Sequence, residues 1–332
     1  MKALVNTAPG KLEMQDWPDP QPGSGQVRVR TAACGICATD IEMIAGWSRT
    51  GFPAIPGHEW SGYVEALGFA TPPELLGKPC VAENVWTDGG EVGFEHPGGY
   101  GQFLITEAKN VRVLPPEFPI TTAALIEPLA VCVRGMNRLK VALASLPAGT
   151  EAGATTALVI GDGPIGLLMV PLLRRAGVKQ VVLIGGRETR LLLAKEFGAA
   201  TLNRRELGER LKETLIASPN YPFSCVIEAS GSPDGAQMAL DMVAREGKVL
   251  VLGDYDDAHA NFRWNHLLHR EIELVGSNAS AGAWDEAVRL ATTGAVQLEK
   301  LITHRIPVSR FAEGMELVRG RRADVIKVVM EW

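Results

Sequence analysis

The sequence predicts a two-domain α/β protein in which an irregular, β-rich domain precedes a doubly wound parallel sheet. Three observations support this fold class. The chain has 332 residues, about twice the usual domain length. Residues 1 to about 125 form short apolar runs separated by glycine and proline, and from about residue 128 strand patterns alternate with helix patterns. A tail after Gly276 is expected to rejoin the first domain, which gives expected domains of 1–128, 129–275 and 276–332.

The composition favours small-molecule partners in a reducing compartment. The hydrophobic content of 46% suffices for two cores, and the net charge of −5 comes without a run of like charges, which argues against nucleic acid and anionic membranes. No stretch approaches 18 uninterrupted apolar residues, and the first residues lack the apolar core of a signal peptide. Five irregularly spaced cysteines indicate reduced thiols with at most a metal or catalytic role. We therefore expect a cytoplasmic protein.

In the first domain, alternation with a period of two predicts short strands and no long helix. These strands are expected at Ala3–Val5, Gln26–Arg30, Gly62–Leu67 and Phe103–Ile105.

The stretch Ala157–Gly166 predicts a buried strand, a G-x-G-x-x-G turn and the start of a helix. Gly161 permits the sharp turn, Gly163 lets a ligand approach the backbone, and Gly166 lets the helix pack closely on the strand. Because a second apolar run, Val181–Ile184, follows at the distance expected in a βαβ unit, this turn is expected to bind the diphosphate of a dinucleotide. The alternative is a glycine-rich turn that binds nothing.

The remaining pattern continues the strand and helix alternation after a loop at 145–156. Beyond Ile184 we expect a helix over Leu191–Phe197 closed by Gly198, a strand over Cys225–Ala229, a helix over Ala236–Val243 and a strand over Val249–Gly253. In the tail we expect a helix over Trp284–Thr292, an extended segment over Leu301–Ile306, a helix over Arg310–Arg319 and a strand over Val325–Met330.

Metal-ligating residue types occur at three places in the first domain. Cys34 and Cys37 form a C-x-x-C, His58-Glu59 follows 21 residues later, and Glu127 lies in an apolar run. Thiolate and imidazole are ligands that zinc prefers, and a carboxylate in so apolar a run needs a partner such as a cation. The alternatives are a redox cysteine pair, a loop histidine and a glutamate stabilised by a helix dipole.

Taken together, the motifs G-I-C-x-T-D, P-G-H-E, I-E-P-L and G-x-G-P-I-G resemble the zinc-dependent medium-chain dehydrogenase/reductase family, particularly its sorbitol-type polyol and sugar-alcohol dehydrogenases. The resemblance implies a GroES-like β-rich catalytic domain and a Rossmann coenzyme domain. It also implies that Cys37, His58 and Glu127 hold the catalytic zinc, with Glu59 as an adjacent or alternating ligand.

By the same resemblance, Asp40 would orient His58 and Thr39 would pass on the substrate proton. Glu42 occupies the position where many relatives have the histidine that ends the proton relay, so Thr39 and Glu42 are the candidate catalytic residues. Many relatives also carry a four-cysteine lobe for a structural zinc. This chain has no cysteine between Cys80 and Ile126, and we expect one catalytic Zn²⁺ per chain.

The expected dinucleotide is NADP(H). Gly185 occupies the place of the acidic residue that binds the adenosine ribose in NAD-specific sites, and Gly185-Gly186-Arg187 leaves room and positive charge for a 2′-phosphate. Arg190 would be a second partner. The alternative is an Arg187 that only begins a helix in solvent. The expected cofactor contacts are Gly161, Gly163, Pro164, Ile165, Gly166, Gly186, Arg187 and Arg190.

These features predict a zinc-dependent oxidoreductase that transfers hydride between NADP(H) and a secondary alcohol or ketone of a polyol, sugar or related small alcohol. The expected site is a cleft between the domains, with Trp47, Phe52 and Trp86 as candidates for its outer wall. The alternatives are an NAD-dependent polyol dehydrogenase and a non-catalytic NADPH-binding sensor. The resemblance implies a homodimer or homotetramer.

Overall fold

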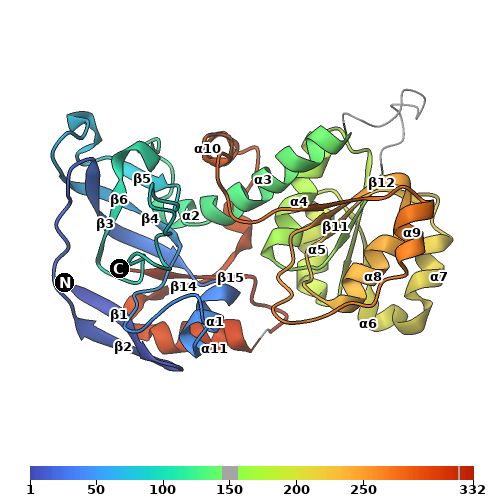
Figure 1. Cartoon of the computed structure of the whole chain (residues 1–332), viewed down its shortest axis with the longest axis horizontal. Coiled ribbons are helices and arrows are strands. Elements are labelled where there is room, and N and C mark those ends of the chain that lie inside the picture. The colour runs from blue at the N-terminus through green and yellow to red at the C-terminus, as the bar shows by residue number, and fades with distance from the viewer. Residues whose placement is uncertain (144–155, 321) are drawn as a thin grey trace. The chain divides into compact units, whose positions relative to one another are not determined.

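The computed structural model describes residues 1–143, 156–320 and 322–332 (Figure 1). The chain divides into two compact units. Unit 1 comprises Met1–Ala130 and Ala281–Trp332, and unit 2 comprises Val131–Ser280. The loop expected at 145–156 lies outside the described residues except for its last residue. In the described ranges, no helix has the length and apolar character needed to cross a membrane.

Unit 2 is built on a six-stranded, all-parallel sheet with the order β10-β9-β8-β11-β12-β13. The strand order reverses between β8 and β11, which is the arrangement of a doubly wound dinucleotide-binding fold and confirms the predicted fold class. Its strands are β8 (Thr156–Ile160), β9 (Gln180–Gly185), β10 (Ala200–Asn203), β11 (Phe223–Glu228), β12 (Val243–Val251) and β13 (Glu273–Gly276).

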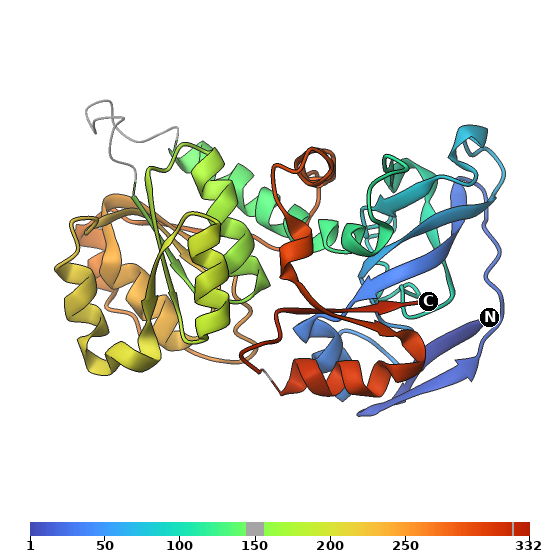
Figure 2. The same cartoon turned by 180° about the vertical axis from the view of Figure 1, so that it is seen from behind.

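Helices cover both faces of this sheet. Helices α4 and α5 pack on β8, β9 and β10, whereas α8 packs on β11 and β12 and contacts α9 on the opposite face (Figures 1 and 2). The helices of this part of the chain are α3 (Ile126–Leu143), α4 (Pro164–Arg175), α5 (Glu188–Glu196), α6 (Arg204–Leu207), α7 (Leu211–Ile216), α8 (Pro233–Met242) and α9 (Trp264–His269).

Local capping explains why one helix begins earlier than expected. Helix α8 begins three residues before the expected Ala236, because the Ser232 hydroxyl accepts a hydrogen bond from the Gly235 amide at 3.1 Å and Pro233 suits the first helical position. Strand β12 begins at Val243 rather than Val249. The short elements β10, α6, α7, α9 and β13 were not predicted, because their brief runs carry little periodicity.

Unit 1 contains a seven-stranded sheet with the order β14-β15-β3-β4-β5-β7, in which β6 also pairs with β3, and a separate hairpin of β1 and β2. Its strands are β1 (Lys2–Ala8), β2 (Lys11–Asp16), β3 (Gln26–Gly35), β4 (Glu59–Leu67), β5 (Pro79–Ala82), β6 (Phe103–Glu107), β7 (Val111–Val113), β14 (Ile302–Pro307) and β15 (Lys327–Glu331). Its helices are α1 (Ala38–Ala45), α2 (Ile120–Ala123), α10 (Trp284–Thr292) and α11 (Phe311–Arg319).

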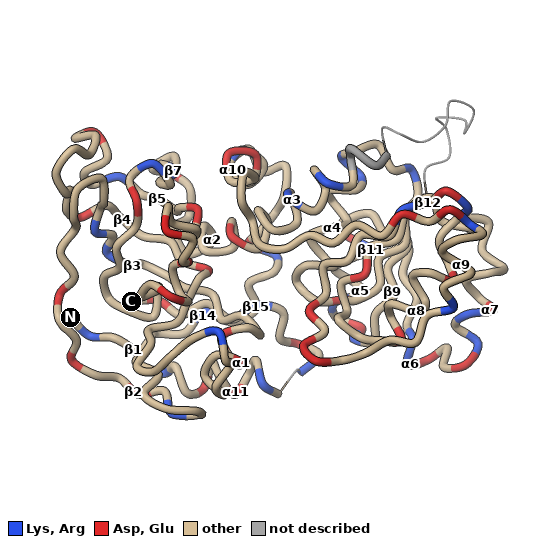
Figure 3. Tube along the Cα trace, in the orientation of Figure 1, with Lys and Arg blue, Asp and Glu red and all other residues tan. Residues whose placement is uncertain are grey.

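The tail completes the sheet of the first domain, as expected. Strand β15 pairs antiparallel with β3, with Met330 opposite Cys34, and β14 adds to its other side. The core of unit 1 joins N-terminal residues such as Leu4 and Trp60 to Met330. Along the trace of each unit, acidic and basic residues are interspersed (Figure 3), in keeping with the charge distribution of the sequence.

Candidate metal and cofactor sites

Strand pairing in unit 1 brings the expected metal ligands together. Strands β3 and β4 run antiparallel with Gly35 opposite Glu59, so the end of one strand lies beside the start of the other. Cys37 follows β3 as the N-cap of α1, and its backbone amide donates to Asp40 Oδ2 at 2.8 Å. The turn between β3 and α1 therefore holds Cys37 next to His58 and Glu59.

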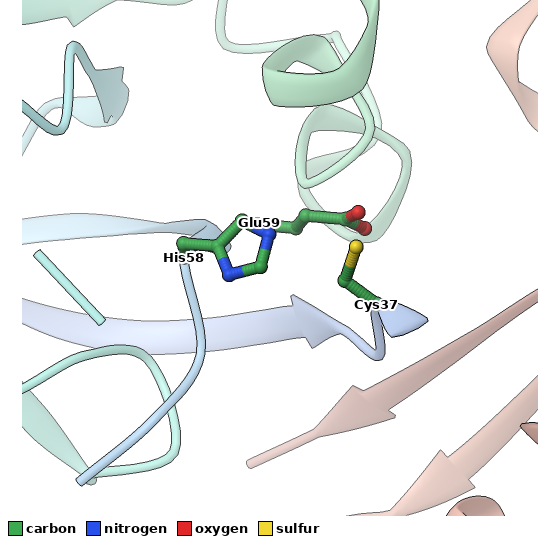
Figure 4. A group of neighbouring side chains, drawn as sticks. All are labelled: Cys37, His58 and Glu59. Carbon is green, nitrogen blue, oxygen red and sulfur yellow. The ribbon is translucent and has the colours of Figure 1, made fainter. Parts of the chain in front are cut away.

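Cys37, His58 and Glu59 form a tight group of possible ligand atoms (Figure 4). The cysteine sulfur, a ring nitrogen and a carboxylate oxygen all lie within 4.8 Å of one another. His58 and Glu59 are buried, and Glu59 Oε2 has no hydrogen-bond partner among the described residues. A buried carboxylate oxygen without a donor, beside a thiol and an imidazole, fits a bound zinc ion.

Buried polar side chains surround His58. Its Nδ1 lies 3.3 Å from Asp40 Oδ1, while Tyr100 donates to Asp40 Oδ2 at 3.1 Å. Burial alone would lower the pKa of His58, but the Asp40 carboxylate raises that pKa well above its ordinary value. Asn84 donates to the backbone carbonyl of His58 at 2.9 Å. Both the ring and the backbone of His58 are therefore fixed from outside the metal group.

Lys327 is a buried cation that the sequence analysis missed. Its ammonium group on β15 donates to the Glu59 carboxylate and, at 3.5 Å, to the Ile36 carbonyl. Burial opposes the charge of Lys327, yet the neighbouring Glu59 raises its pKa above the ordinary value. A lysine that begins an apolar run of strand residues is a signal that was available, since such a charge needs a buried partner.

Glu127 lies beside the group but not within it. It is buried in the first turn of α3, and burial raises its pKa to about 7, with His58 opposing and Glu59 reinforcing the shift. The carboxylate in the tight group with Cys37 and His58 is Glu59, whereas Glu127 was expected there. The geometry thus places Glu59 with Cys37 and His58, and leaves Glu127 as an adjacent carboxylate.

The proposed proton-relay residues lie on α1. Thr39 Oγ1 is 3.6 Å from Cys37 Sγ, and Glu42 is exposed on the next turn of the helix. The other cysteine of the C-x-x-C, Cys34, is fully buried in the hydrophobic core and is not a member of the metal group.

The three aromatic candidates for a pocket wall lie in different places. Trp47 contacts the ring of Phe94 edge-on, with centroids 6.3 Å apart, and Phe94 stacks on His58. Trp86 stacks on His96 at 3.8 Å and lines a small cavity of about 50 Å³ together with Met1 and Trp17, among others. Phe52 is partly exposed.

In unit 2, the glycine-rich turn has the backbone that its motif predicts. Gly161 has φ +119°, and a Cβ on Gly166 would lie 2.0 Å from the Gly161 carbonyl oxygen. A Cβ on Gly163 would meet no atom within 4 Å, so this side of the turn is open. Pro164 and Ile165 form the first turn of α4, where free amide groups can bind a diphosphate.

Arg187 is neither in free solvent nor unpaired. Its backbone amide and Nε donate to the Asp162 carboxylate at 2.9 Å each, and the amide of Gly186 donates to the same carboxylate at 2.8 Å. Arg190 Nη1 donates to the Asp162 carbonyl at 3.2 Å. Burial would raise the pKa of Asp162, but Arg187 holds it below its ordinary value. This pairing could not be predicted from the sequence.

Two further arginines lie at the same place. A Cβ on Gly186 would lie 3.0 Å from Arg205 Nε and 3.3 Å from Arg204 Nε. These side chains come from α6, directly after β10, and were not predicted. Together with Arg187 and Arg190, they gather positive charge around the end of β9.

Comparison with known proteins gives matches along nearly all of the chain. The family model for the alcohol dehydrogenase GroES-like domain matches residues 23–116, and that for the glucose dehydrogenase C-terminus matches residues 120–332. The galactitol 1-phosphate 5-dehydrogenase of Escherichia coli strain K12 is 26% identical, and the sorbitol dehydrogenase of Halalkalibacterium halodurans is 25% identical, each alignment covering 99% of both chains. A Sinorhizobium meliloti 1021 structure bound to NADP, provisionally named a zinc-binding dehydrogenase, matches with a TM-score of 0.88 and 26% identity, covering 100% of this chain and 99% of that one.

Proposed function

The chain belongs to the zinc-dependent medium-chain dehydrogenase/reductase family of alcohol and polyol dehydrogenases, and from this premise we propose that it transfers hydride between NADP(H) and the secondary hydroxyl of a polyol, sugar or related small alcohol. The observation that carries this proposal is the group of Cys37, His58 and Glu59 in a chain that also has the glycine-rich turn of unit 2. A non-catalytic NADPH sensor would not need that ligand set.

In the proposed site, Cys37, His58 and Glu59 hold one zinc ion, and Glu127 is the carboxylate that alternates with Glu59. When bound, zinc lowers the pKa of an alcohol hydroxyl. Thr39, whose hydroxyl both accepts and donates, takes the substrate proton and passes it toward Glu42 on the exposed side of α1. Metal analysis of the purified chain tests the ligand set: we expect one zinc per chain.

The proposed cofactor is NADP(H), held by Gly161, Gly163, Pro164, Ile165, Gly166 and Gly186 and by the arginines at the end of β9. Support comes from the lack of a carboxylate at position 185 and from Arg187, Arg190, Arg204 and Arg205 around the position where a 2′-phosphate would lie. One observation favours the alternative, NAD(H): the charge of Arg187 is already paired with Asp162. One charge-assisted contact between an arginine at the end of β9 and the 2′-phosphate contributes roughly 1.5 to 3 kcal/mol. Such a contact predicts a preference of about tenfold or more for NADP⁺ in kcat/KM.

Initial rates with both cofactors distinguish these alternatives. We expect Arg187→Ala to lose efficiency with NADP⁺ and to keep it with NAD⁺. A Cβ at position 185 would lie 2.6 Å from both Cβ and Oδ2 of Asp162, so a variant designed to prefer NAD⁺ must combine Gly185→Asp and Arg187→Ser with Asp162→Gly. Equal wild-type efficiency with both cofactors would argue against the NADP(H) assignment. A panel of polyols, sugar phosphates and simple secondary alcohols then identifies the substrate.

We further propose a cytoplasmic homodimer or homotetramer. The five cysteines are all thiols rather than disulfides, as expected in a reducing compartment. Strand β13 lies at the edge of its sheet, and Trp264, Leu268 and Leu274 are large apolar side chains exposed on α9 and β13. Such a surface favours association with a second copy. Light scattering coupled to gel filtration tests this, and a monomer at micromolar concentration would contradict it.

A further inference from the structure

The segment before Tyr100 forms a closed turn that the proposed function does not explain. We call residues 91–98 the buttress turn. The Gly93 amide donates to the His96 carbonyl at 2.8 Å, and the His96 amide donates to the Glu91 carbonyl at 3.1 Å. The Glu91 amide donates to Glu95 Oε2 at 3.0 Å. Backbone and side-chain bonds therefore fix the shape of this turn.

The backbone of the buttress turn lies directly against the backbone that leads into His58. A Cβ on Gly93, which has φ +90°, would lie 2.7 Å from both the Gly57 carbonyl carbon and the His58 amide nitrogen. A Cβ on Gly98 would lie 2.4 Å from the Gly57 carbonyl oxygen. Only glycine permits so close an approach, so the turn and the His58 backbone are packed as one body.

Phe94 extends this contact to the side chain of His58. The two rings are stacked, with centroids 4.9 Å apart and an interplanar angle of 29°. Asp40 lies at Nδ1 of the same imidazole. The carboxylate therefore restrains the edge of the ring and the phenyl group restrains its face.

Arg49 ties the buttress turn to the loop after α1. Its Nε donates to Glu95 Oε1 at 2.7 Å, and its Nη2 donates to Glu95 Oε2 at 3.0 Å and to Glu91 Oε1 at 2.8 Å. The guanidinium carbon lies 4.4 Å from the centroid of the Phe94 ring. Bidentate geometry with two carboxylates and an aromatic contact makes this more than an ordinary surface ion pair.

We propose that Arg49 and Phe94 are positioning residues that hold His58 in its metal-binding orientation, with Arg49 acting through the buttress turn. This inference rests on the proposed zinc site. The physical reason is that a metal ligand binds tightly only when its ring cannot rotate or tilt away from the ion, and groups that restrain a ligand from behind raise metal affinity about 10- to 100-fold. In this segment, the ion pairs of Arg49 and the stacking of Phe94 supply that restraint.

The test is the rate at which the full-length, zinc-loaded protein releases zinc to an excess of a colorimetric chelator. We expect Arg49→Met and Phe94→Leu each to release zinc about tenfold faster than the wild type. The double variant should be little faster than Phe94→Leu alone, because both changes act on the same contact. High salt should accelerate release from the wild type but not from Arg49→Met, since the ion pairs are partly exposed.

Arg289→Met is the matched control, because Arg289 makes a similar two-bond pair with Glu286 on α10 and lies outside the metal group. It should release zinc at the wild-type rate. If Arg49→Met does not fold, Glu95→Gln tests the same pair with a smaller change. The inference is overturned if Phe94→Leu releases zinc at the wild-type rate and the ion-pair variant, Arg49→Met or its substitute Glu95→Gln, does so too. A wild type that binds no zinc would instead refute the zinc site itself.

Discussion

Replacing Lys327 by methionine should destabilise unit 1 strongly when no metal is present. Lys327 and Glu59 are both buried, and the ammonium group is the cation that pairs with the Glu59 carboxylate. Methionine keeps much of the side-chain volume but removes the charge, so packing changes little. In the variant, the buried Glu59 carboxylate loses its cation and remains close to a second buried carboxylate, Glu127.

The size of the effect follows from this burial. Breaking a buried ion pair by removing one partner costs about 3 to 5 kcal/mol, because the remaining charge has lost its compensation. For a unit of this size, that corresponds to a fall in Tm of roughly 6 to 20 °C. The pKa of Lys327 is higher in the folded protein than in the unfolded chain, where it is about 10.4. The contribution of Lys327 to stability is therefore fully present below about pH 10.4 and is lost only as the pH rises through the higher folded pKa. Measurements near neutral pH therefore capture the whole effect.

Thermal unfolding of the chelator-treated protein, followed by tryptophan fluorescence, measures this change. Every tryptophan except Trp264 lies in unit 1, so the signal reports chiefly on that unit. Zinc should restore more stability to Lys327→Met than to the wild type, because the ion supplies the missing positive charge next to Glu59. Adding Glu59→Gln to Lys327→Met should recover much of the loss.

Lys2→Met is the control, because Lys2 pairs with Asp16 on the exposed surface of the same unit. Such an exposed, solvent-screened pair contributes little to stability. If Lys327→Met lowers the Tm no more than Lys2→Met does, the buried ion pair does not stabilise the metal-free protein and the reasoning fails.

Three further predictions concern the metal group. In the metal-free protein above pH 7, Glu127→Gln should be more stable than the wild type by about 3 kcal/mol, because the raised pKa of about 7 makes the ionised Glu127 unfavourable in the folded state. This gain in stability should disappear as the pH falls toward 4.5. Unfolding curves measured across this pH range check the prediction. Cys37→Ala should abolish zinc binding and turnover together, whereas Cys34→Ala should keep both, as metal analysis and rates will show. Thr39→Val should keep its zinc but lower kcat by about 10²-fold or more, and an unchanged kcat when chemistry limits the rate would rule out Thr39 as the relay.

The sequence by itself determined the features that depend on neighbouring residues. The G-x-G-x-x-G turn at Gly161 follows from local backbone geometry, and the alternation of apolar runs predicted the parallel sheet of unit 2. Cys37 and His58 were recognisable as candidate ligands from residue type and motif. The return of the C-terminal tail to the first domain was also expected, and in the structure β15 pairs with β3.

Only the tertiary structure decided which distant side chains share the site. Lys327 is far from Glu59 along the chain, and Phe94 reaches His58 through a turn with no recognisable motif. The pairing of Arg187 with Asp162 likewise depends on two parallel strands lying side by side, and it changes how much charge is left for a cofactor phosphate. The physical reason is the same in each case: periodicity and propensity are local, whereas burial and charge pairing depend on which strands become neighbours.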